Sequence, residues 1–558
     1  MGGALTRRAI LASATAVAAA ATLSMGQAAA AAGPAPRRAA ARAAGYSGGS
    51  AGGGAPALNP NVAATLTLTN AFGSLAPPLT MPADAAKGGA LNAQALFNPT
   101  DAGTWVGAAA FSNWATLYPN VKFSVVPALW SGAEGGKAPL LTQLAGGTAP
   151  DIFPTYGDSV APYVSQGVLA DLTPFAANSA VFKTLPGSMQ ALVTMNNKIW
   201  GLPGGAFGGY CIAYRKDLFD AAHVPYPNPN WTMADYVATA AKLTNPARKV
   251  WGTNLLWQYT NWFFSLLAEP LGVPTPGSFN PVPNEAGTNY AYAPPEELAK
   301  PLALYQQLVK DKSALWGSSE TFGQITNDFT AGHVAMVIKM TKQLNGFLAN
   351  IGQPGFLQPD QIGIVPMPQG PEGMRVGAFG ATPYAINATV TGEKLALAWE
   401  LLHTMIGAPG TSLAFAAGAL GGQIPALPSP YAGVAVPPSV SAAFPAQWMA
   451  ALNSNMILHL PGKPNPSAYG IPPYPPGAMS GLNPYIQKAM VNPTMSPLSI
   501  AQEAVTTLTA STMQGTLPGL SKSNWHAYYQ ALGAFLKQYY PTFYAGTYTK
   551  YYKRFETW

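Results

Sequence analysis

Short apolar segments alternate with helical patterns over the first part of the chain, and this alternation restricts the fold more than any other feature. Residues 64–69, 121–126 and 152–153 are strand-like. Helical spacing lies between them, over residues 105–118 and 137–147. Strand, helix, strand, helix, strand is the order that builds a parallel sheet covered by helices. The sequence therefore predicts an α/β fold.

The same alternation continues in the second half of the chain. Further strand-like runs occur at 208–215, 334–338, 362–365 and 383–386. Helical spacing follows Thr232, which we expect to be an N-cap, and covers residues 296–311 and 393–406. Because a chain of 558 residues is long enough for several domains, we expect more than one α/β unit.

Composition excludes several classes of function. The net charge of +7 includes arginines near the N-terminus, and the body has no Lys/Arg-rich run, so nucleic acid is not an expected partner. The five histidines are scattered and form no H-E-x-x-H pair, so we expect neither a metal site nor a cofactor. The only cysteine, Cys211, rules out an intramolecular disulfide.

The N-terminal segment has the parts of an export signal. Arg7 and Arg8 precede a weakly apolar stretch and a run of small residues, so residues 1–32 are interpreted as a signal that resembles the twin-arginine type, with an ordinary Sec signal as the alternative. Residues 33–60 are interpreted as a flexible tether. We expect a periplasmic, extracellular or cell-surface protein, without a lipid on a signal-peptide cysteine and without a transmembrane helix.

Five phrases, in order along the chain, carry a resemblance to a known family. They are GGTAPDIF at 146–153, YRKDLF at 214–219, NWTMADYV at 230–237, FTAGHVAM at 329–336 and PMPQG at 366–370. Together with the segments around them, they resemble the extracellular solute-binding proteins of family 1, the class that includes maltose-binding protein. The resemblance runs from about residue 62 to residue 425.

The resemblance implies a two-lobed periplasmic-binding-protein fold of type II. In this fold two α/β lobes are joined by crossing hinge strands, and the ligand lies in the cleft between them. The implied function is that of the receptor of an ABC importer, which captures a sugar or oligosaccharide and delivers it to the membrane permease. We expect a monomer and no catalytic residue.

We expect the lobes to be discontinuous in sequence. Lobe 1 is assigned to residues 61–175 with part of 300–390, and lobe 2 with the hinge to residues 176–300 and 390–523. Residues 524–558 form an aromatic, helical C-terminal extension. Two readings of this extension stay open: it packs on its own domain, or it docks on a partner, a membrane surface or a wall polymer.

A sugar site needs polar groups for the hydroxyls and aromatic faces for the C–H groups. The resemblance places candidate residues at the cleft, although Asp158 is equally suited to cap a helix and Trp262 to be buried in a lobe. The candidates are Trp130, Tyr156, Asp158, Phe207, Tyr210, Trp257, Tyr259, Trp262, Lys339, Met340, Arg375 and Phe379. Asp151 is expected to order its own turn. A missing carboxylate in the cleft loop and the Met340-Thr341 pair argue against a maltodextrin ligand.

Two alternatives come from other classes. A secreted carbohydrate-active hydrolase needs two carboxylates across its cleft, and most of the few acidic residues here fall in helices or turns. The G-x-S-x-G match at 48–52 lies in the tether, so it does not indicate a nucleophile. A cell-surface carbohydrate-binding scaffold is suggested by the Pro-rich region 425–498 and the aromatic tail.

Overall fold

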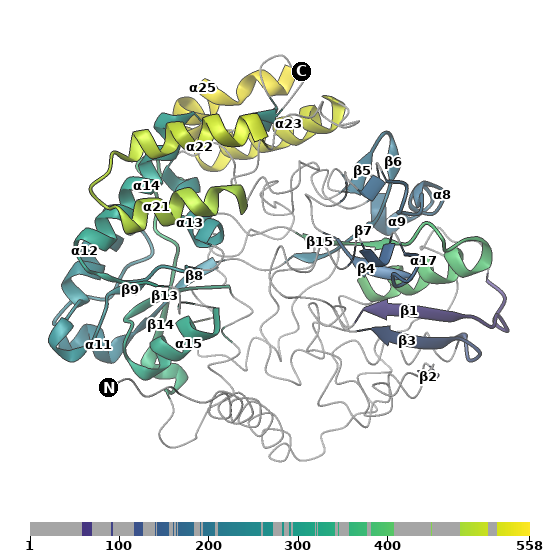
Figure 1. Cartoon of the computed structure of the whole chain (residues 1–558), viewed down its shortest axis with the longest axis horizontal. Coiled ribbons are helices and arrows are strands. Elements are labelled where there is room, and N and C mark those ends of the chain that lie inside the picture. The colour runs from purple at the N-terminus through teal and green to yellow at the C-terminus, as the bar shows by residue number, and fades with distance from the viewer. Residues whose placement is uncertain are drawn as a thin grey trace, which may run out of the picture.

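The computed structural model shows its two largest sheets, each with its own helices, on opposite sides of the molecule (Figure 1). We call the side with β1 lobe 1 and the side with β8 lobe 2. The structure describes residues 58–69, 91–92, 117–126, 140, 142–144, 146–155, 160, 163–164, 166–183, 190, 193–206, 210–257, 260–271, 282–283, 290–291, 294–317, 320, 322–340, 344, 357–375, 381–406, 448, 480–511 and 522–557. The expected export signal and tether thus lie outside the described residues, apart from the last few positions of the tether.

Lobe 1 is built on a six-stranded sheet with the order β2-β3-β1-β4-β15-β7. Its strands are β1 (Thr65–Thr69), β2 (Leu91–Asn92), β3 (Lys122–Val126), β4 (Ile152–Pro154), β7 (Leu202–Ala206) and β15 (Ala381–Ile386). β1 pairs in parallel with both β3 and β4, whereas β15 runs antiparallel to β4 and β7. The parallel core confirms the α/β class predicted from the first half of the sequence.

Helix α17 (Gly392–Ile406) packs against β7 and β15 of the lobe 1 sheet. Its Trp399 is fully buried and stacks on Phe175 of α8 (Thr173–Ala176), with ring centroids 5.7 Å apart. The structure thus places β7 and α17 with lobe 1, whereas the sequence-based division assigned residues 176–300 and 390–523 to lobe 2. The reason is that β7 and β15 pair with each other at one edge of the lobe 1 sheet.

Asp151 has a different role from the one expected. Its carboxylate accepts a hydrogen bond from the backbone N–H of Thr67 at 2.7 Å and pairs with Lys394 Nζ at 2.8 Å. It therefore joins β1 to α17 instead of ordering its own turn.

Lobe 2 is built around β8 (Tyr210–Arg215), which pairs antiparallel with β13 (Met336–Met340) on one side and β14 (Ile362–Pro366) on the other. A parallel bridge between Trp251 and Val334 brings the chain before β9 (Thr253–Asn254) alongside the chain that enters β13. β9 pairs in parallel with β12 (Ala314–Leu315).

Helices cover the lobe 2 sheet. They are α11 (Lys216–Ala221), α12 (Met233–Leu243), α13 (Thr260–Ala268), α14 (Pro295–Lys310), α15 (Phe322–Ala331), α21 (Asn483–Val491) and α22 (Pro497–Ser511). The expected N-cap of α12 is confirmed, because Thr232 and Asp235 form a capping box. The remaining short strands and α-helix of the chain are α9 (Ala180–Lys183), β5 (Thr194–Met195), β6 (Lys198–Ile199), β10 (Val282–Pro283) and β11 (Tyr290–Ala291), and short 3-10 helices are η4 (Pro246–Arg248), η5 (Glu269–Leu271), η7 (Pro359–Gln361) and η9 (Ser480–Leu482).

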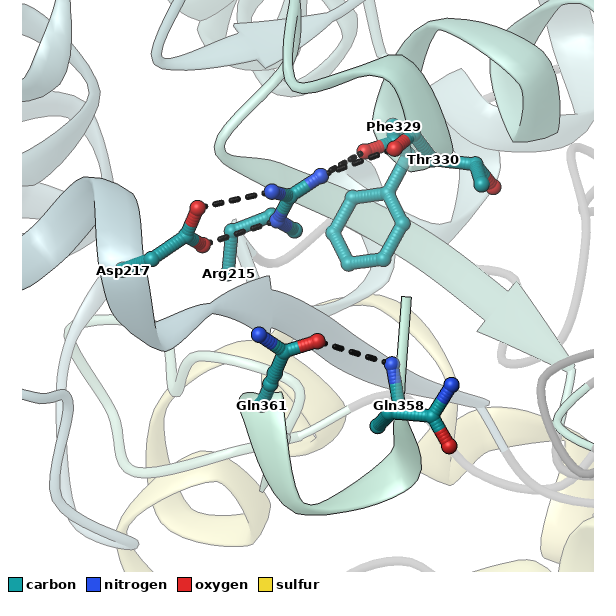
Figure 2. Close-up of polar contacts among 6 residues, drawn as sticks. All are labelled: Arg215, Asp217, Phe329, Thr330, Gln358 and Gln361. Carbon is teal, nitrogen blue, oxygen red and sulfur yellow. Dashed lines mark hydrogen bonds and ion pairs between the residues drawn. The ribbon is translucent and has the colours of Figure 1, made fainter. Parts of the chain in front are cut away.

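Arg215, at the end of β8, ties together two of the phrases that carry the family resemblance (Figure 2). Its guanidinium pairs with the Asp217 carboxylate through two hydrogen bonds of 2.7 and 2.8 Å and donates to the carbonyls of Phe329 and Thr330 at 3.0 and 2.9 Å. Phe329 and Thr330 lie in the last turn of α15, where carbonyls lack the regular helical partner, and the Phe329 carbonyl also accepts from the N–H of Gly332 at 3.2 Å. Both phrases therefore serve the fold.

The C-terminal extension packs on lobe 2. Its elements are α23 (Lys522–Tyr539), α24 (Pro541–Phe543), the π-helical segment η10 (Tyr544–Tyr548), α25 (Thr549–Tyr551) and η11 (Lys553–Thr557). Tyr529 is buried and stacks on Phe555 at 4.7 Å, and both belong to the same apolar core as β8. The Tyr551 hydroxyl donates to Glu297 of α14 at 3.0 Å. These contacts support the reading in which the extension covers its own domain.

Successive described elements change lobe three times, and the third change falls between α17 of lobe 1 and Trp448, which belongs to the core of lobe 2. The first two changes fall between β7 and β8 and between β14 and β15, as the resemblance implies for hinge strands. Among the helices that the structure describes, none is both long and apolar enough to cross a membrane.

Candidate ligand-binding site

The parallel strands of lobe 1 end on the side that faces lobe 2. Figure 1 shows the arrowheads of β1 and β3 directed toward lobe 2, and β4 runs parallel to β1. Ligands of open α/β sheets bind beyond the carboxyl ends of the strands. Three predicted residues follow these ends in sequence, Trp130 after β3 and Tyr156 and Asp158 after β4, but all three lie outside the described residues.

In lobe 2 a corresponding edge is formed where β8 begins. The register pairs Tyr210 with Met340, so the start of β8 lies beside the end of β13. β14 is also antiparallel to β8, so it ends at the same edge. The chain at Trp251, directly before β9, runs parallel to the chain that enters β13, so β9 also ends at this edge. β12 ends there too, because it is parallel to β9. Figure 1 shows α11, which follows β8, on the far side of the lobe. We call this edge the interlobe edge of lobe 2.

Five of the predicted residues are brought together at this edge or directly beyond it. They are Tyr210, Trp257, Lys339, Met340 and Arg375. Trp262 lies in α13, a short way along the chain after Trp257. Only the backbone of Trp262 is described. Phe207, Tyr259 and Phe379 lie outside the described residues. The contacts of these residues with a ligand remain predictions.

Two of the five are committed to contacts within the protein. Lys339 is buried, and its ammonium donates to the Thr326 hydroxyl; burial lowers the pKa of Lys339 to about 8. Arg375 is also buried, and donates to the Met367 carbonyl at 2.7 Å and to Gln369 at 3.3 Å. Burial lowers the pKa of Arg375 as well. Both side chains therefore stabilise the backbone next to the interlobe edge by hydrogen bonds within lobe 2.

Trp257 and Trp316 form a stacked pair beyond two neighbouring strand ends. Trp257 follows β9 and Trp316 follows β12, and their ring centroids lie 6.0 Å apart with 24° between the planes. Both side chains are half-buried against the core of lobe 2. Gln487 of α21 fixes the backbone of Trp257 by donating to its carbonyl at 3.1 Å. Gly317, at φ +151°, turns the chain directly after Trp316.

Asn254 and Glu320 lie beside this aromatic pair, and both are buried with 3% of their surface exposed. Neither the amide nitrogen and oxygen of Asn254 nor Oε2 of Glu320 has a hydrogen-bond partner. Burial, and after it the nearby Asp328 carboxylate, raises the pKa of Glu320 to about 6. The Asn254 amide lies close enough to lower this pKa somewhat, although the two groups do not reach hydrogen-bond geometry.

Asn254, Trp316 and Glu320 are not among the residues predicted from the sequence. One signal was available, since the phrase ALWGSSE at 314–320 places a tryptophan and an acid directly after a short apolar segment. The strand in that phrase has only two residues, too few for periodicity to show. No group of three acidic, His or Cys side chains suited to a metal occurs within the described part of the chain.

Solved structures with the same architecture include sugar-binding proteins. An ABC substrate-binding protein of Listeria monocytogenes in complex with cycloalternan aligns over 81% of this chain and 99% of its own, with 19% identity and a TM-score of 0.56. A solute-binding protein of Thermotoga lettingae bound with α-D-tagatose aligns over 80% and 99%, with 15% identity and a TM-score of 0.57. UgpB of Mycobacterium tuberculosis, in complex with glycerophosphocholine, aligns over 73% and 94%, with 15% identity and a TM-score of 0.54.

These likenesses establish the two-lobed fold, which the resemblance had implied. A curated relative, an uncharacterized lipoprotein of Streptomyces antibioticus, is 28% identical over 137 residues, which is 24% of this chain and 29% of that protein. The matched part thus spans less than a third of the relative's length. The profile of the bacterial extracellular solute-binding proteins matches residues 97–411, more than half of the chain. The chain is a member of the bacterial extracellular solute-binding protein family.

Proposed function

We propose that the protein is the extracytoplasmic receptor of an ABC importer and that it captures a sugar or small oligosaccharide between its lobes. The observation that carries this proposal is the Trp257–Trp316 pair beside unpartnered polar atoms at the interlobe edge of lobe 2. Aromatic faces bind the C–H faces of a sugar ring, and amide or carboxyl groups bind its hydroxyls. A membrane permease would receive the closed, loaded form.

The placement of the chain's three changes of lobe supports a closing cleft. Each lobe has its own sheet and core, and the described residues on either side of each change belong to different sheets or their helices. A ligand that contacts both lobes therefore stabilises the closed arrangement by the contacts that only this arrangement offers. The sugars bound by the Listeria and Thermotoga proteins agree with this proposal. The competing proposal is a solute like glycerophosphocholine, which UgpB binds.

We further propose that bound sugar is not hydrolysed. The family is one of binding proteins, and glycoside hydrolysis requires two carboxylates placed across the cleft. Incubation of the protein with each bound sugar, followed by chromatography of the products, tests this point. Release of a smaller sugar at a rate that depends on protein concentration would favour the hydrolase.

Localisation follows from the family in outline, because its members are extracellular. We propose in addition that this chain is exported by a twin-arginine signal and is not held by a lipid on a signal-peptide cysteine. The paired arginines Arg7 and Arg8 support the twin-arginine signal, and the burial of the one cysteine, Cys211, in lobe 2 supports the absence of such a lipid. Lysine replacement of Arg7 and Arg8 should abolish export, and mass spectrometry of the exported protein should show no lipid.

Thermal unfolding with added solutes tests the central proposal. A ligand present at a hundred times its Kd stabilises the folded state by about 2.7 kcal/mol, which raises the Tm by several degrees. We expect at least one of cycloalternan, maltose, D-tagatose and D-mannitol to do so. A rise with glycerophosphocholine alone, or with none of these solutes, would contradict the sugar assignment.

A further inference from the structure

The Asn254 and Glu320 side chains come from two loops that the backbone holds together. Asn254 pairs in register with Leu315 in the parallel ladder of β9 and β12. Beyond the ladder, the N–H of Leu255 donates to the Leu315 carbonyl at 2.8 Å, and the N–H of Trp257 donates to the Glu320 carbonyl at 3.4 Å. The position of one side chain relative to the other is therefore set by the fold.

Three polar atoms of this pair are buried and lack a partner at hydrogen-bond geometry, although the Asn254 amide lies near the Glu320 carboxyl. An unpaired buried donor or acceptor costs about 1–3 kcal/mol, and folded proteins leave few of them. Here three such atoms, Nδ2 and Oδ1 of Asn254 and Oε2 of Glu320, meet at one place. A bound molecule that forms hydrogen bonds with these atoms would offset this unfavourable free energy.

The charges around the pair select the class of molecule. The groups that perturb Glu320 are the Asp328 carboxylate and the Asn254 amide, and none of them is a cation. An anionic ligand group would be repelled by Asp328, whereas a neutral hydroxyl both donates and accepts hydrogen bonds. The half-buried indoles of Trp257 and Trp316 lie next to the pair and offer an apolar face.

We propose that Asn254 and Glu320 form a hydroxyl-binding pair that takes two neighbouring hydroxyl groups of an uncharged sugar or polyol. The Asn254 amide donates to one hydroxyl and accepts from the same group or its neighbour, and the Glu320 carboxyl binds the other. This inference rests on the proposed function, because it names residues of lobe 2 that bind the same ligand.

Substitutions that keep the shape of the side chains test the pair. Asn254→Leu and Glu320→Gln are compared with wild type and with Glu296→Gln, a substitution of an exposed acid at the start of α14. The probes are cycloalternan, maltose, D-tagatose and D-mannitol in isothermal titration calorimetry, and the Tm of each ligand-free protein is measured alongside. We expect each substitution in the pair to raise the Kd at least tenfold and to leave the ligand-free Tm unchanged or higher, while Glu296→Gln changes neither value.

The ligand-free Tm separates a binding pair from a structural one. If Asn254→Leu and Glu320→Gln lower the Tm by several degrees and leave the Kd within twofold of wild type, the pair is structural and the inference is overturned. If wild type binds a sugar and both variants bind it unchanged at an unchanged Tm, only the pair is refuted. If wild type binds none of the four probes, the proposed function fails, and the pair fails with it.

Discussion

The indole rings of Trp257 and Trp316 stack with their centroids 6.0 Å apart, although one follows β9 and the other follows β12. The parallel pairing of those two strands brings the rings together at the interlobe edge of lobe 2. The sheet thereby converts two distant sequence positions into one aromatic surface, which is the form that recognition of a sugar face requires.

Removal of one ring of this pair should weaken sugar binding. An aromatic contact is worth about 0.5–1.5 kcal/mol beyond the area it buries, so we expect Trp316→Ala to raise the Kd about tenfold. Calorimetry with the sugar that raises the Tm most measures this. The control is Tyr226→Ala, an exposed aromatic residue that packs on Tyr214 at the other end of β8. Equal affinity of Trp316→Ala and wild type would remove Trp316 from the site.

The N-terminus of α12 offers a test of local stability. The Thr232 hydroxyl accepts from the N–H of Asp235 at 3.1 Å, and loss of such a cap typically lowers the free energy of unfolding by about 1 kcal/mol. We expect this loss in Thr232→Ala, measured by urea unfolding. Thr239→Ala in the middle of the same helix should be neutral or slightly stabilising, because alanine has the higher helix propensity. The reverse order of the two variants would refute the capping role.

The buried thiol of Cys211 should be unreactive in the folded protein. Cys211 lies on β8, the central strand of the lobe 2 sheet, and has no exposed surface. Burial raises the pKa of its thiol to about 12. Because the thiolate is the reactive form, we expect no reaction with Ellman's reagent at pH 8 until the protein is unfolded by urea. Rapid labelling without urea would show that lobe 2 opens locally.

His403 should make the protein less stable in acid. It is buried in lobe 1, with Nε2 3.5 Å from the Ser179 hydroxyl, and burial lowers its pKa from 6.5 to about 4. Between these two values the unfolded chain binds a proton that the folded protein does not, so the free energy of unfolding falls as the pH is lowered from 6.5 to 4. The full loss amounts to about 3 kcal/mol.

A substitution isolates this effect from other titrating groups. Burial raises the pKa of Glu400 on the same helix, which acts in the opposite direction by favouring the folded state in acid. His403→Gln removes only the histidine contribution, so urea unfolding of this variant should depend less steeply on pH between 6.5 and 4 than wild type does. Identical slopes for the two proteins would contradict a neutral, buried His403.

The C-terminal extension should contribute strongly to the stability of lobe 2. Tyr529 is 2% exposed and stacks on both Phe555 and Tyr552. Truncation of a large buried aromatic side chain costs about 3–5 kcal/mol, so we expect a loss of this size in Tyr529→Ala, measured by urea unfolding. Lys553→Ala, an exposed position in the same extension, is the control. A small effect of Tyr529→Ala would revive the reading in which the extension serves a partner.

The order and type of the main elements could be predicted from the sequence. β8, for instance, is a run of buried side chains between polar segments, and α12 begins at a capping residue followed by an acid three positions later. These signals are local, and the chain repeats them in the order that the α/β architecture requires.

The membership of β7 and α17 in lobe 1 could not be predicted in the same way. The pairing of β7 with β15 joins segments that are far apart in the chain, and no local pattern specifies such a contact. Asn254, Trp316 and Glu320 were missed for a related reason: β9 and β12 have two residues each, and only their pairing gives the following side chains a common location. Asp151 likewise appeared to serve its own turn because its partners, Thr67 and Lys394, are remote in sequence.

Small-angle X-ray scattering of the exported protein, with and without the sugar that raises its Tm most, tests the central claim most directly. Capture of a sugar between two lobes draws the lobes together, so we predict a smaller radius of gyration at saturating sugar and no change with glycerophosphocholine. An unchanged radius of gyration with every sugar that binds, or the absence of any sugar that binds, would contradict the account.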